Sequence, residues 1–309
     1  MKDIIKTISS CGYTAKINLS RGANCISLKN RNYKASLLRE ADSGTKLDNP
    51  YLYGMPILFP VNRIFGGRFK FEGREYIFDI NEPDTNCHLH GHIHEKQFEV
   101  AKIGKDFISC IYINDRNDSN FPHKFMIKMD YNLSDKGLLH KTEITNLSDE
   151  NMPIFLGFHT TFPIPFLKDS SPEDVRIRAQ IGEEIERDMR TYLPTGKIVS
   201  NEVVEKIRNG TFKPFDKRIS CHCSSLENGV IEIIETRRGI KLVYENDPKY
   251  KFRLFYNGNA DTYICLEPMT CMANCQNSPF DRSYAGFNWI EPQGTKKYIS
   301  RLYLSEVLM

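Results

Sequence analysis

The chain contains 309 residues, 40% of them hydrophobic and 11% aromatic, so it can bury a large core and does not resemble a disordered chain. Its 42 basic and 39 acidic residues give a net charge of only +3, without long runs of either sign, so the sequence shows no nucleic-acid-binding surface. Because the amino terminus lacks an apolar signal core and no apolar segment has the length of a membrane span, we expect a cytoplasmic protein whose partner is a small molecule, not a membrane.

The first clear pair of strands lies at residues 68–80, RFKFEGREYIFDI. Phe69 and Phe71 alternate with charged residues, the dipeptide Glu72–Gly73 predicts a tight turn, and Tyr76 and Phe78 resume the alternation. This segment predicts a β-hairpin.

The same alternation recurs along the rest of the chain. It is present at residues 107–113, at 124–148 with a turn at 135–137, at 229–245 with a turn at 238–239, and at 296–308. A short helix is expected around residues 183–190. Many strands joined by tight turns, without alternating strand and helix units, predict an all-β protein with a large antiparallel β-sandwich, or a barrel, in a single domain spanning residues 1–309.

Four histidines alternate in NCHLHGHIHE, residues 86–95: His88, His90, His92 and His94. In one regular strand all four rings would share a face, but Gly91 interrupts the run and predicts a bulge or a close backbone approach, so the rings are expected to diverge. A zinc site needs three or four convergent ligands. The tract alone leaves a metal site, a catalytic group and a polar edge open.

Three further charged or titratable residues stand in apolar surroundings. Arg63 precedes a glycine pair in PILFPVNRIFGGRF and can be a structural ion pair or a donor for ligand oxygens. His159, in MPIFLGFHTTFPIPF, can be a hydrogen-bonded core histidine or a functional one. Glu267, in TYICLEPMT, can be a buried partner of an arginine or a general base.

The nine cysteines are an odd number without a dense framework, which predicts reduced thiols in a reducing compartment. The pairs Cys221 with Cys223 and Cys271 with Cys275 do not have zinc-finger spacing. We expect them to be free thiols.

Several motifs in order resemble the aldose 1-epimerase (galactose mutarotase) family. They run from residue 56 to residue 294 and include PILFPVNRIFGGRF, HLHG, GFHTTF, LPTG, YICLEPMT and AGFNWIEPQGT. Each motif alone is weak, and their joint order carries the resemblance. The resemblance implies a β-supersandwich with a sugar pocket on a concave face.

The resemblance also implies roles for particular residues. Glu267, His159 and His90 match the family's catalytic glutamate and its two histidines. The substrate-binding positions that it implies are Arg63, Asp216 and Phe162, and Asp216 can equally be a turn residue.

Anomer interconversion explains why such groups are needed. A base takes the proton of the C1 hydroxyl while an acid protonates the ring oxygen, the ring opens to an aldehyde, and it recloses after rotation about the C1–C2 bond. Glu267 is the expected base, because apolar surroundings raise a carboxyl pKa toward neutrality, and His159 is the expected acid. His90 would polarise near the ring oxygen, Arg63 and Asp216 would hold hydroxyls, and Phe162 would stack on the sugar. No metal and no other cofactor is expected.

Differences from the family pattern concern the sugar more than the reaction. Phe98 stands where many members have tryptophan, and His92 replaces the second glycine of the usual HGG. Alternatives are a hexose-6-phosphate 1-epimerase, which should gather several Arg or Lys residues, and a non-catalytic carbohydrate-binding protein. A metal-dependent enzyme using two of the alternating histidines is a further alternative, and both a monomer and a homodimer are compatible with the sequence.

Overall fold

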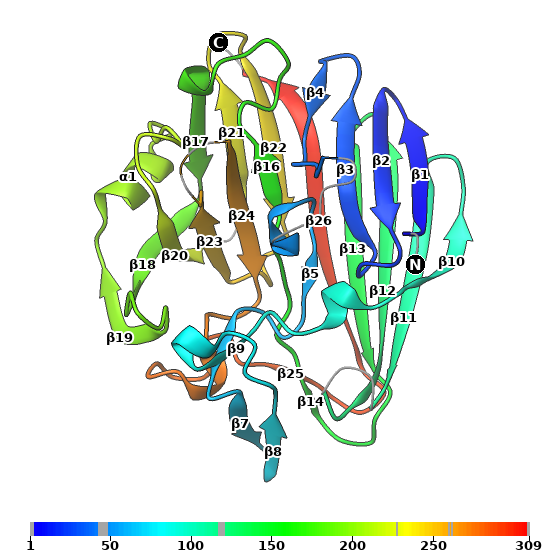
Figure 1. Cartoon of the computed structure of the whole chain (residues 1–309), viewed down its shortest axis with the longest axis vertical. Coiled ribbons are helices and arrows are strands. Elements are labelled where there is room, and N and C mark those ends of the chain that lie inside the picture. Colours follow the sequence, from blue (N-terminus) through cyan, green and yellow to red (C-terminus); the bar gives the residue numbers. More distant parts are fainter. Residues whose placement is uncertain are drawn as a thin grey trace.

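Two large antiparallel sheets make up most of the molecule (Figure 1). The structure is a computed structural model, and it describes residues 3–42, 49–116, 121–226, 228–258, 260 and 262–307. The first sheet contains, in spatial order, β10 (Glu99–Ile103), β11 (Phe107–Asp115), β12 (Lys124–Ser134), β13 (Gly137–Asn146), β26 (Thr295–Glu306), β22 (Ile240–Asn246), β21 (Ile231–Glu235) and β17 (Val175–Ala179). The second contains β19 (Pro194–Val199), β18 (Ile181–Arg187), β20 (Ser220–Ser225), β23 (Phe252–Tyr256), β24 (Tyr263–Met269), β15 (Gly157–Phe158) and β5 (Ile57–Leu58), with β16 (Thr161–Pro163) also paired to β24.

Smaller sheets complete the fold. One lies beside β11 and β12 and contains β1 (Ile5–Ser10), β2 (Tyr13–Asn18), β3 (Asn24–Asn30) and β4 (Ala35–Ser36). Three two-stranded sheets pair β6 (Arg63–Phe65) with β9 (Cys87–Leu89), β7 (Arg68–Phe71) with β8 (Arg74–Ile77), and β14 (Met152–Pro153) with β25 (Trp289–Ile290).

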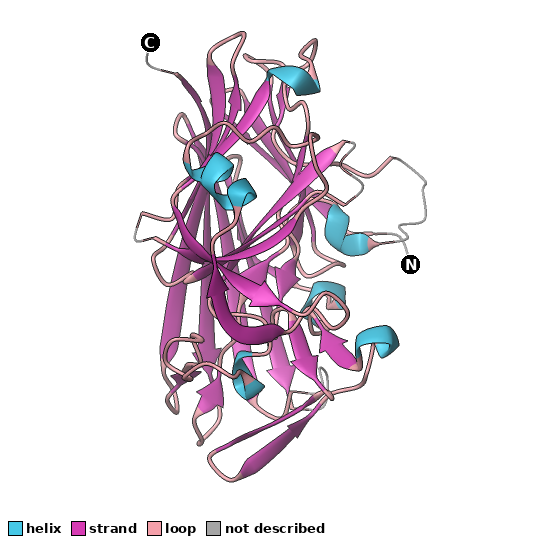
Figure 2. Cartoon of the chain, turned by 90° about the vertical axis from the view of Figure 1, so that its left-hand side faces the viewer, coloured by secondary structure: helices cyan, strands magenta, loops and turns pink. Residues whose placement is uncertain are grey.

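The helices are short and lie in the connections between strands (Figure 2). They are α1 (Glu202–Arg208) and the 3₁₀ turns η1 (Pro50–Leu52), η2 (Pro83–Thr85), η3 (Ile93–Glu95), η4 (Pro172–Asp174) and η5 (Cys275–Asn277). None of the described helices has the length and apolar character needed to cross a membrane.

The two large sheets pack their apolar faces together. Phe162 on β16 contacts Tyr244 on β22 with ring centroids 5.6 Å apart, and Phe158 on β15 meets His140 on β13 at 4.9 Å. Within β12 buried residues alternate with more exposed ones, as expected of a strand with one face in the core. These observations confirm the predicted all-β class and the antiparallel β-sandwich.

The predicted hairpins are confirmed. Phe71 pairs with Arg74 across the turn at Glu72 and Gly73, both of which have positive φ angles of 46° and 78°. This is the geometry of a tight two-residue hairpin turn, which glycine adopts without strain. The turns expected near residues 135–137 and 238–239 likewise connect β12 with β13 and β21 with β22.

The helix predicted around residues 183–190 is wrong, because most of this segment is strand β18. Ile181 and Ile185 are both buried, and a spacing of four fits a helix face as well as a strand face. Glutamates and arginines favour helix in isolation, but pairing with β19 and β20 overrides this preference. The helix lies later, at α1, where Asn201 caps it by accepting a hydrogen bond from the Val203 backbone N–H at 2.8 Å.

Candidate active site

Glu267 and His159 meet because their two segments run antiparallel. Gly157 pairs with Met269 and Thr161 pairs with Cys265, so positions 159 and 267 fall opposite each other midway between these pairs. His159 Nε2 lies 3.1 Å from Glu267 Oε1. The carboxylate is completely buried, and His159 is 7% exposed. These two residues are 108 positions apart in the chain, so the sequence alone did not show that they are in contact.

His90 joins this pair from the loop after β9. Its backbone N–H donates to the Asn62 carbonyl at 3.1 Å, and its ring lies edge-on to His159 with centroids 5.6 Å apart. Tyr51 on η1 covers the histidines, with ring centroids 4.7 Å from His90 and 6.0 Å from His159. The three predicted catalytic residues therefore form one cluster, which we call the inner cluster, with Tyr51 over it.

The turn at Gly91 directs the four histidines to two places, with His90 and His94 in one and His88 and His92 in the other. His90 and Gly91 both have left-handed backbone conformations, with φ of 67° and 64°, and a Cβ at Gly91 would lie 2.0 Å from the Phe59 carbonyl oxygen. Only glycine fits this close approach. The rings diverge as predicted. His94 packs on Tyr51 at 4.7 Å, on the same side as His90, whereas His88 and His92 lie beside Asp79.

Burial sets the protonation of the inner cluster. It raises the pKa of Glu267 to about 8, although the charges of Arg187 and Arg63 oppose this shift. It lowers the pKa of His159 to about 4 and that of His90 well below its ordinary value. Between these values Glu267 and His159 together hold one titratable proton. The second carboxylate oxygen of Glu267, Oε2, and the Nδ1 atoms of His159 and His90 have no hydrogen-bond partner among the described residues. Buried polar atoms of this kind are expected to bond to a ligand or to water.

Arg63 is held beside the cluster by an ion pair. Its guanidinium contacts both carboxylate oxygens of Glu82 at 2.6 Å and lies 4.6 Å from the Tyr192 ring centroid. Arg63 therefore combines the two roles that the sequence left open. The ion pair with Glu82 fixes its side chain, and the positive charge of its guanidinium still acts on His90 and Glu267.

Arg187 and His222 also belong to this region, and sequence reasoning missed both. Arg187 is 8% exposed, donates to the carbonyl and hydroxyl of Ser220, and has an Nε without a partner among the described residues. His222 stands opposite Leu254, which stands opposite Glu267, so the three side chains share one face of the sheet. Arg187 was assigned to a helix, and the CHC segment drew attention to its thiols instead of to His222.

The structure does not bring Asp216 and Phe162 to the inner cluster. Asp216 is exposed in the turn after α1, where its backbone N–H donates to the Lys213 carbonyl at 3.3 Å, which agrees with a turn role. Phe162 is completely buried, and it alternates with Thr161 and Pro163 on β16, so it points away from the face of Glu267 into the core. It therefore packs between the sheets and is not placed to stack on a sugar.

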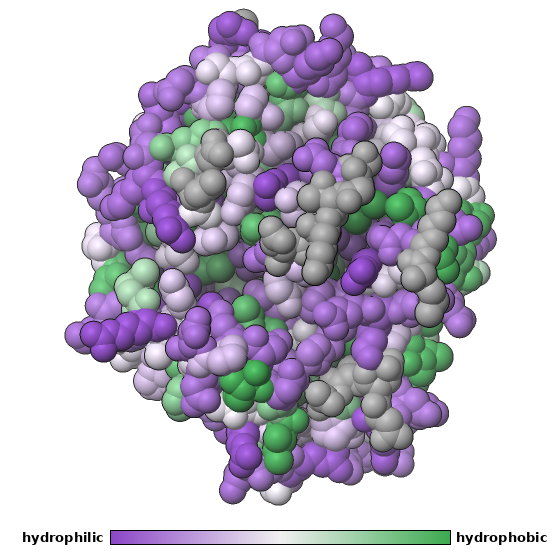
Figure 3. Space-filling model, in the orientation of Figure 1, coloured by the Kyte–Doolittle hydropathy of each residue, from purple (hydrophilic) through white to green (hydrophobic). Residues whose placement is uncertain are grey.

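A cavity of about 700 Å³ lies between the amino-terminal strands β1–β3 and the segments around η1 and η3, and Glu267, His159 and His90 are not among its described lining residues. Its described lining includes His94, Tyr53 and Pro56, and Pro56 accepts the backbone hydrogen bond of His159 at 3.0 Å. Hydrophilic side chains cover most of this face of the molecule, and hydrophobic ones appear in scattered groups (Figure 3). A monosaccharide fits the size of such a cavity.

The fold and the inner cluster together define a β-sandwich protein with a buried carboxylate and imidazole suited to general acid–base chemistry. A model of the aldose 1-epimerase family matches residues 3–285. The chain belongs to the aldose 1-epimerase family, as the order of its motifs predicted.

Individual relatives support this assignment. A galactose mutarotase-like protein from Clostridium acetobutylicum has a crystal structure similar to this one with a TM-score of 0.92 and 30% identity, over 99% of this chain and 98% of that one. The uncharacterised protein YphB of Escherichia coli K12 is 24% identical over 223 residues, which are 70% of this chain and 72% of that protein. A galactose 1-epimerase from Lactobacillus acidophilus has the same fold, with a TM-score of 0.71 at 14% identity over the whole of both chains. The mutarotase-like sandwich is thereby confirmed.

Proposed function

We propose that this protein is an aldose 1-epimerase that interconverts the α and β anomers of an aldose by acid–base ring opening. The observation that carries the proposal is the buried contact of 3.1 Å between His159 Nε2 and Glu267 Oε1, two residues from distant segments of the chain. Family membership makes the reaction class the natural one for this pair.

The reaction needs one group to accept a proton from the C1 hydroxyl and another to donate a proton to the ring oxygen. Near neutral pH the pair holds one proton between Glu267, with a pKa of about 8, and His159, with a pKa of about 4. If the proton is on His159, Glu267 is the base and His159 the acid. If it is on Glu267, the roles are exchanged. Both arrangements contain the same number of protons, and ring closure on the opposite face uses the exchanged roles.

The remaining residues of the site do not transfer protons. Their proposed role is to stabilise the negative charge that develops on the sugar oxygen in the transition state. The sugar ring opens to an aldehyde, whose oxygen gains negative character in the transition state. His90 lies 5.6 Å from His159 and can donate a hydrogen bond to that region, while Arg63, fixed by Glu82, supplies a positive charge nearby. We further propose a reducing, cytoplasmic location, because all nine cysteines are free.

A negatively charged aldose, such as a hexose 6-phosphate, is the second candidate substrate. Arg187 is a second arginine near Glu267, it is buried, and its described hydrogen bonds go to Ser220 instead of to a carboxylate. A guanidinium beside a candidate sugar site, with no described hydrogen bond to a carboxylate, favours a ligand with a phosphate or carboxylate group.

Saturation-transfer NMR on the purified protein tests both candidates. We expect faster exchange between the anomeric protons of at least one member of a panel of free hexoses, hexuronates and hexose 6-phosphates. A preference of tenfold or more for the charged sugars, lost in Arg187→Gln, would favour the second candidate over the first. Binding of a sugar without faster exchange would show a non-catalytic carbohydrate-binding protein and would contradict the proposal.

A further inference from the structure

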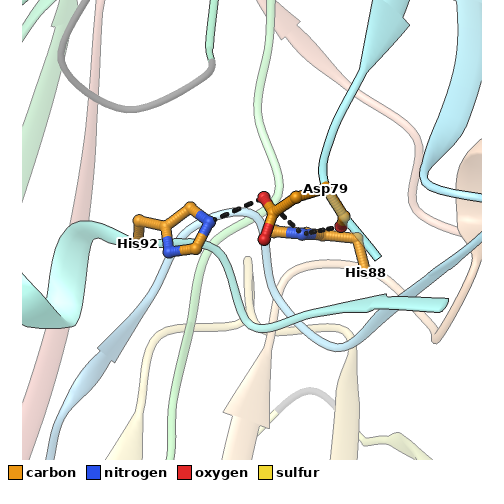
Figure 4. A group of neighbouring side chains, drawn as sticks. All are labelled: Asp79, His88 and His92. Carbon is orange, nitrogen blue, oxygen red and sulfur yellow. Dashed lines mark hydrogen bonds and ion pairs between the residues drawn. The ribbon is translucent and has the colours of Figure 1, made fainter. Parts of the chain in front are cut away.

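A second group of ligand-type side chains lies outside the inner cluster (Figure 4). It contains Asp79, which follows β8, His88 on β9 and His92 just before η3. One donor atom from each residue lies within 4.8 Å of the other two. We call these three residues the outer cluster, and the proposed epimerase reaction does not use them.

The carboxylate of Asp79 stands between the two imidazoles. Its Oδ1 is 2.8 Å from His92 Nε2 and 3.5 Å from His88 Nδ1, and Figure 4 shows both rings directed toward it. In a tetrahedral zinc site with metal–ligand bonds of about 2.0–2.2 Å, neighbouring ligand atoms are about 3.3 Å apart. The two contacts of Asp79 are therefore close to the spacing of a metal-ligand set, and all three donor atoms lie within 4.8 Å of one another.

The backbone holds these side chains in place. His88 is completely buried and pairs with Ile64 across β6 and β9. The left-handed turn at His90 and Gly91, packed against Phe59, returns the chain so that His92 faces Asp79. A metal ion would therefore meet ligands that are already ordered, which lowers the entropic cost of binding.

Two existing hydrogen bonds compete with a metal ion. His92 Nε2 and Asp79 Oδ1, which lie 2.8 Å apart, must exchange their mutual hydrogen bond for bonds to the metal. His88 Nδ1 lies 2.9 Å from the Asp79 backbone carbonyl and must give up this bond to coordinate. His88 Nε2 is buried and has no partner among the described residues, so the proton can move to Nε2 without breaking a second bond.

We propose that Asp79, His88 and His92 bind one divalent transition-metal ion of the zinc type. Two imidazoles and a carboxylate are ligands that suit Zn²⁺ and Co²⁺ and do not suit Ca²⁺ or Mg²⁺. Three protein ligands leave a fourth position for water. Because His88 and His92 flank His90 by two residues on each side, the bound ion would brace the loop that carries His90.

Titration calorimetry of the chelator-treated protein with ZnCl₂ tests the proposal, with Co²⁺ absorption as a second readout. We expect one ion per chain, a cobalt spectrum with the intensity of four-coordination, and a higher Tm in the presence of zinc. Asp79→Asn and His92→Gln should each weaken binding at least tenfold and abolish the Tm increase. Asp84→Asn, the same change at an exposed aspartate outside the outer cluster, is the matched control and should leave binding unchanged.

Two results would overturn the proposal. The first is the absence of zinc binding by the wild-type protein at micromolar concentrations. The second is binding that survives both Asp79→Asn and His92→Gln, or that an aldose displaces, because the ion would then reside on thiols or on the inner cluster. Neither result bears on the epimerase activity, which is assayed in chelator.

Discussion

The molecule contains two carboxylate–imidazole contacts that look alike in distance and differ in environment. His159 Nε2 and Glu267 Oε1 are 3.1 Å apart in the interior, and His92 Nε2 and Asp79 Oδ1 are 2.8 Å apart at the surface. The side chain of Glu267 is completely buried, whereas that of Asp79 is 46% exposed.

Their protonation differs in direction. Burial raises the pKa of Glu267 to about 8. At Asp79 burial is the largest single influence and raises the pKa, but the hydrogen bond to His92 and the charges of His92 and His88 together outweigh it, and the pKa is lowered. Solvent exposure, and not the contact distance, therefore decides whether such a pair is a proton-sharing unit or an ordinary ion pair. Changes to the two pairs should have effects of very different size.

The largest effect is expected from Glu267→Gln. The amide keeps the shape of the side chain but cannot exchange a proton, so the anomerisation rate constant should fall about 10²-fold to 10⁴-fold. At pH 9 the same variant should be more stable than the wild type, since the wild type must bury a carboxylate charge there, at a cost on the order of a few kcal/mol. Activity by saturation-transfer NMR and stability by urea unfolding measure the two effects.

Glu75→Gln is the matched control for this variant. Glu75 is exposed on β8, and its loss should change the rate less than twofold and the free energy of unfolding by less than about 0.5 kcal/mol. An active Glu267→Gln protein would show that the buried pair is structural, and the proposed mechanism would fail.

The next effect is the pH dependence of activity. The rate should be highest while the pair holds one proton and should fall about tenfold per pH unit above about 8, where Glu267 loses it, and below about 4, where His159 gains another. A pH–rate profile between pH 3.5 and 10 measures both limbs. A flat profile across this range would exclude Glu267 and His159 as the groups that transfer protons.

Stability should vary with pH in the opposite senses for the two groups. The pKa of Glu267 rises from 4.5 to about 8 on folding, so the folded state binds the proton more tightly and stability is lost as the pH rises toward 8. The pKa of His159 falls from 6.5 to about 4, so its contribution is lost as the pH falls toward 4. Glu267→Gln should remove only the loss of stability that occurs as the pH rises from 4.5 to about 8.

The sequence could predict those features of the site that depend on residues close together in the chain, and not those that depend on pairing between distant segments. Alternating hairpins such as residues 68–78 were predictable, because strand period and turn residues are neighbours in the chain. The meeting of His159 with Glu267 depends on pairing between β16 and β24, which no local pattern contains. Arg187 was missed because Ile181 and Ile185 fit either period, and the pairing of β18 decided the outcome.

The two histidine pairs show the same limit at shorter range. The alternation of histidines at residues 88–94 suggested that all four rings share one face of a strand. Gly91 was the signal that this alternation would be interrupted. Which histidine would meet Tyr51 and which would meet Asp79 depended on contacts with Phe59 and η1, which are distant in sequence. Sequence motifs could place His90 in the site, but only the fold could identify the outer cluster.

The smallest effect is expected from Asp79→Asn, measured in chelator so that no metal contributes. Since the pKa of Asp79 is lowered on folding, its stabilising contribution is present above the ordinary pKa of 3.8 and is lost as the pH falls. The side chain is nearly half exposed, and solvent screening limits the loss at pH 7 to about 1 kcal/mol or less. At pH values well below the lowered pKa of Asp79, where the carboxyl is protonated in both states, the variant and the wild type should unfold at similar urea concentrations. A loss of several kcal/mol at pH 7 would mean that Asp79 anchors the loop of His90 structurally, and the contrast between a buried proton-sharing pair and an exposed ion pair would no longer hold.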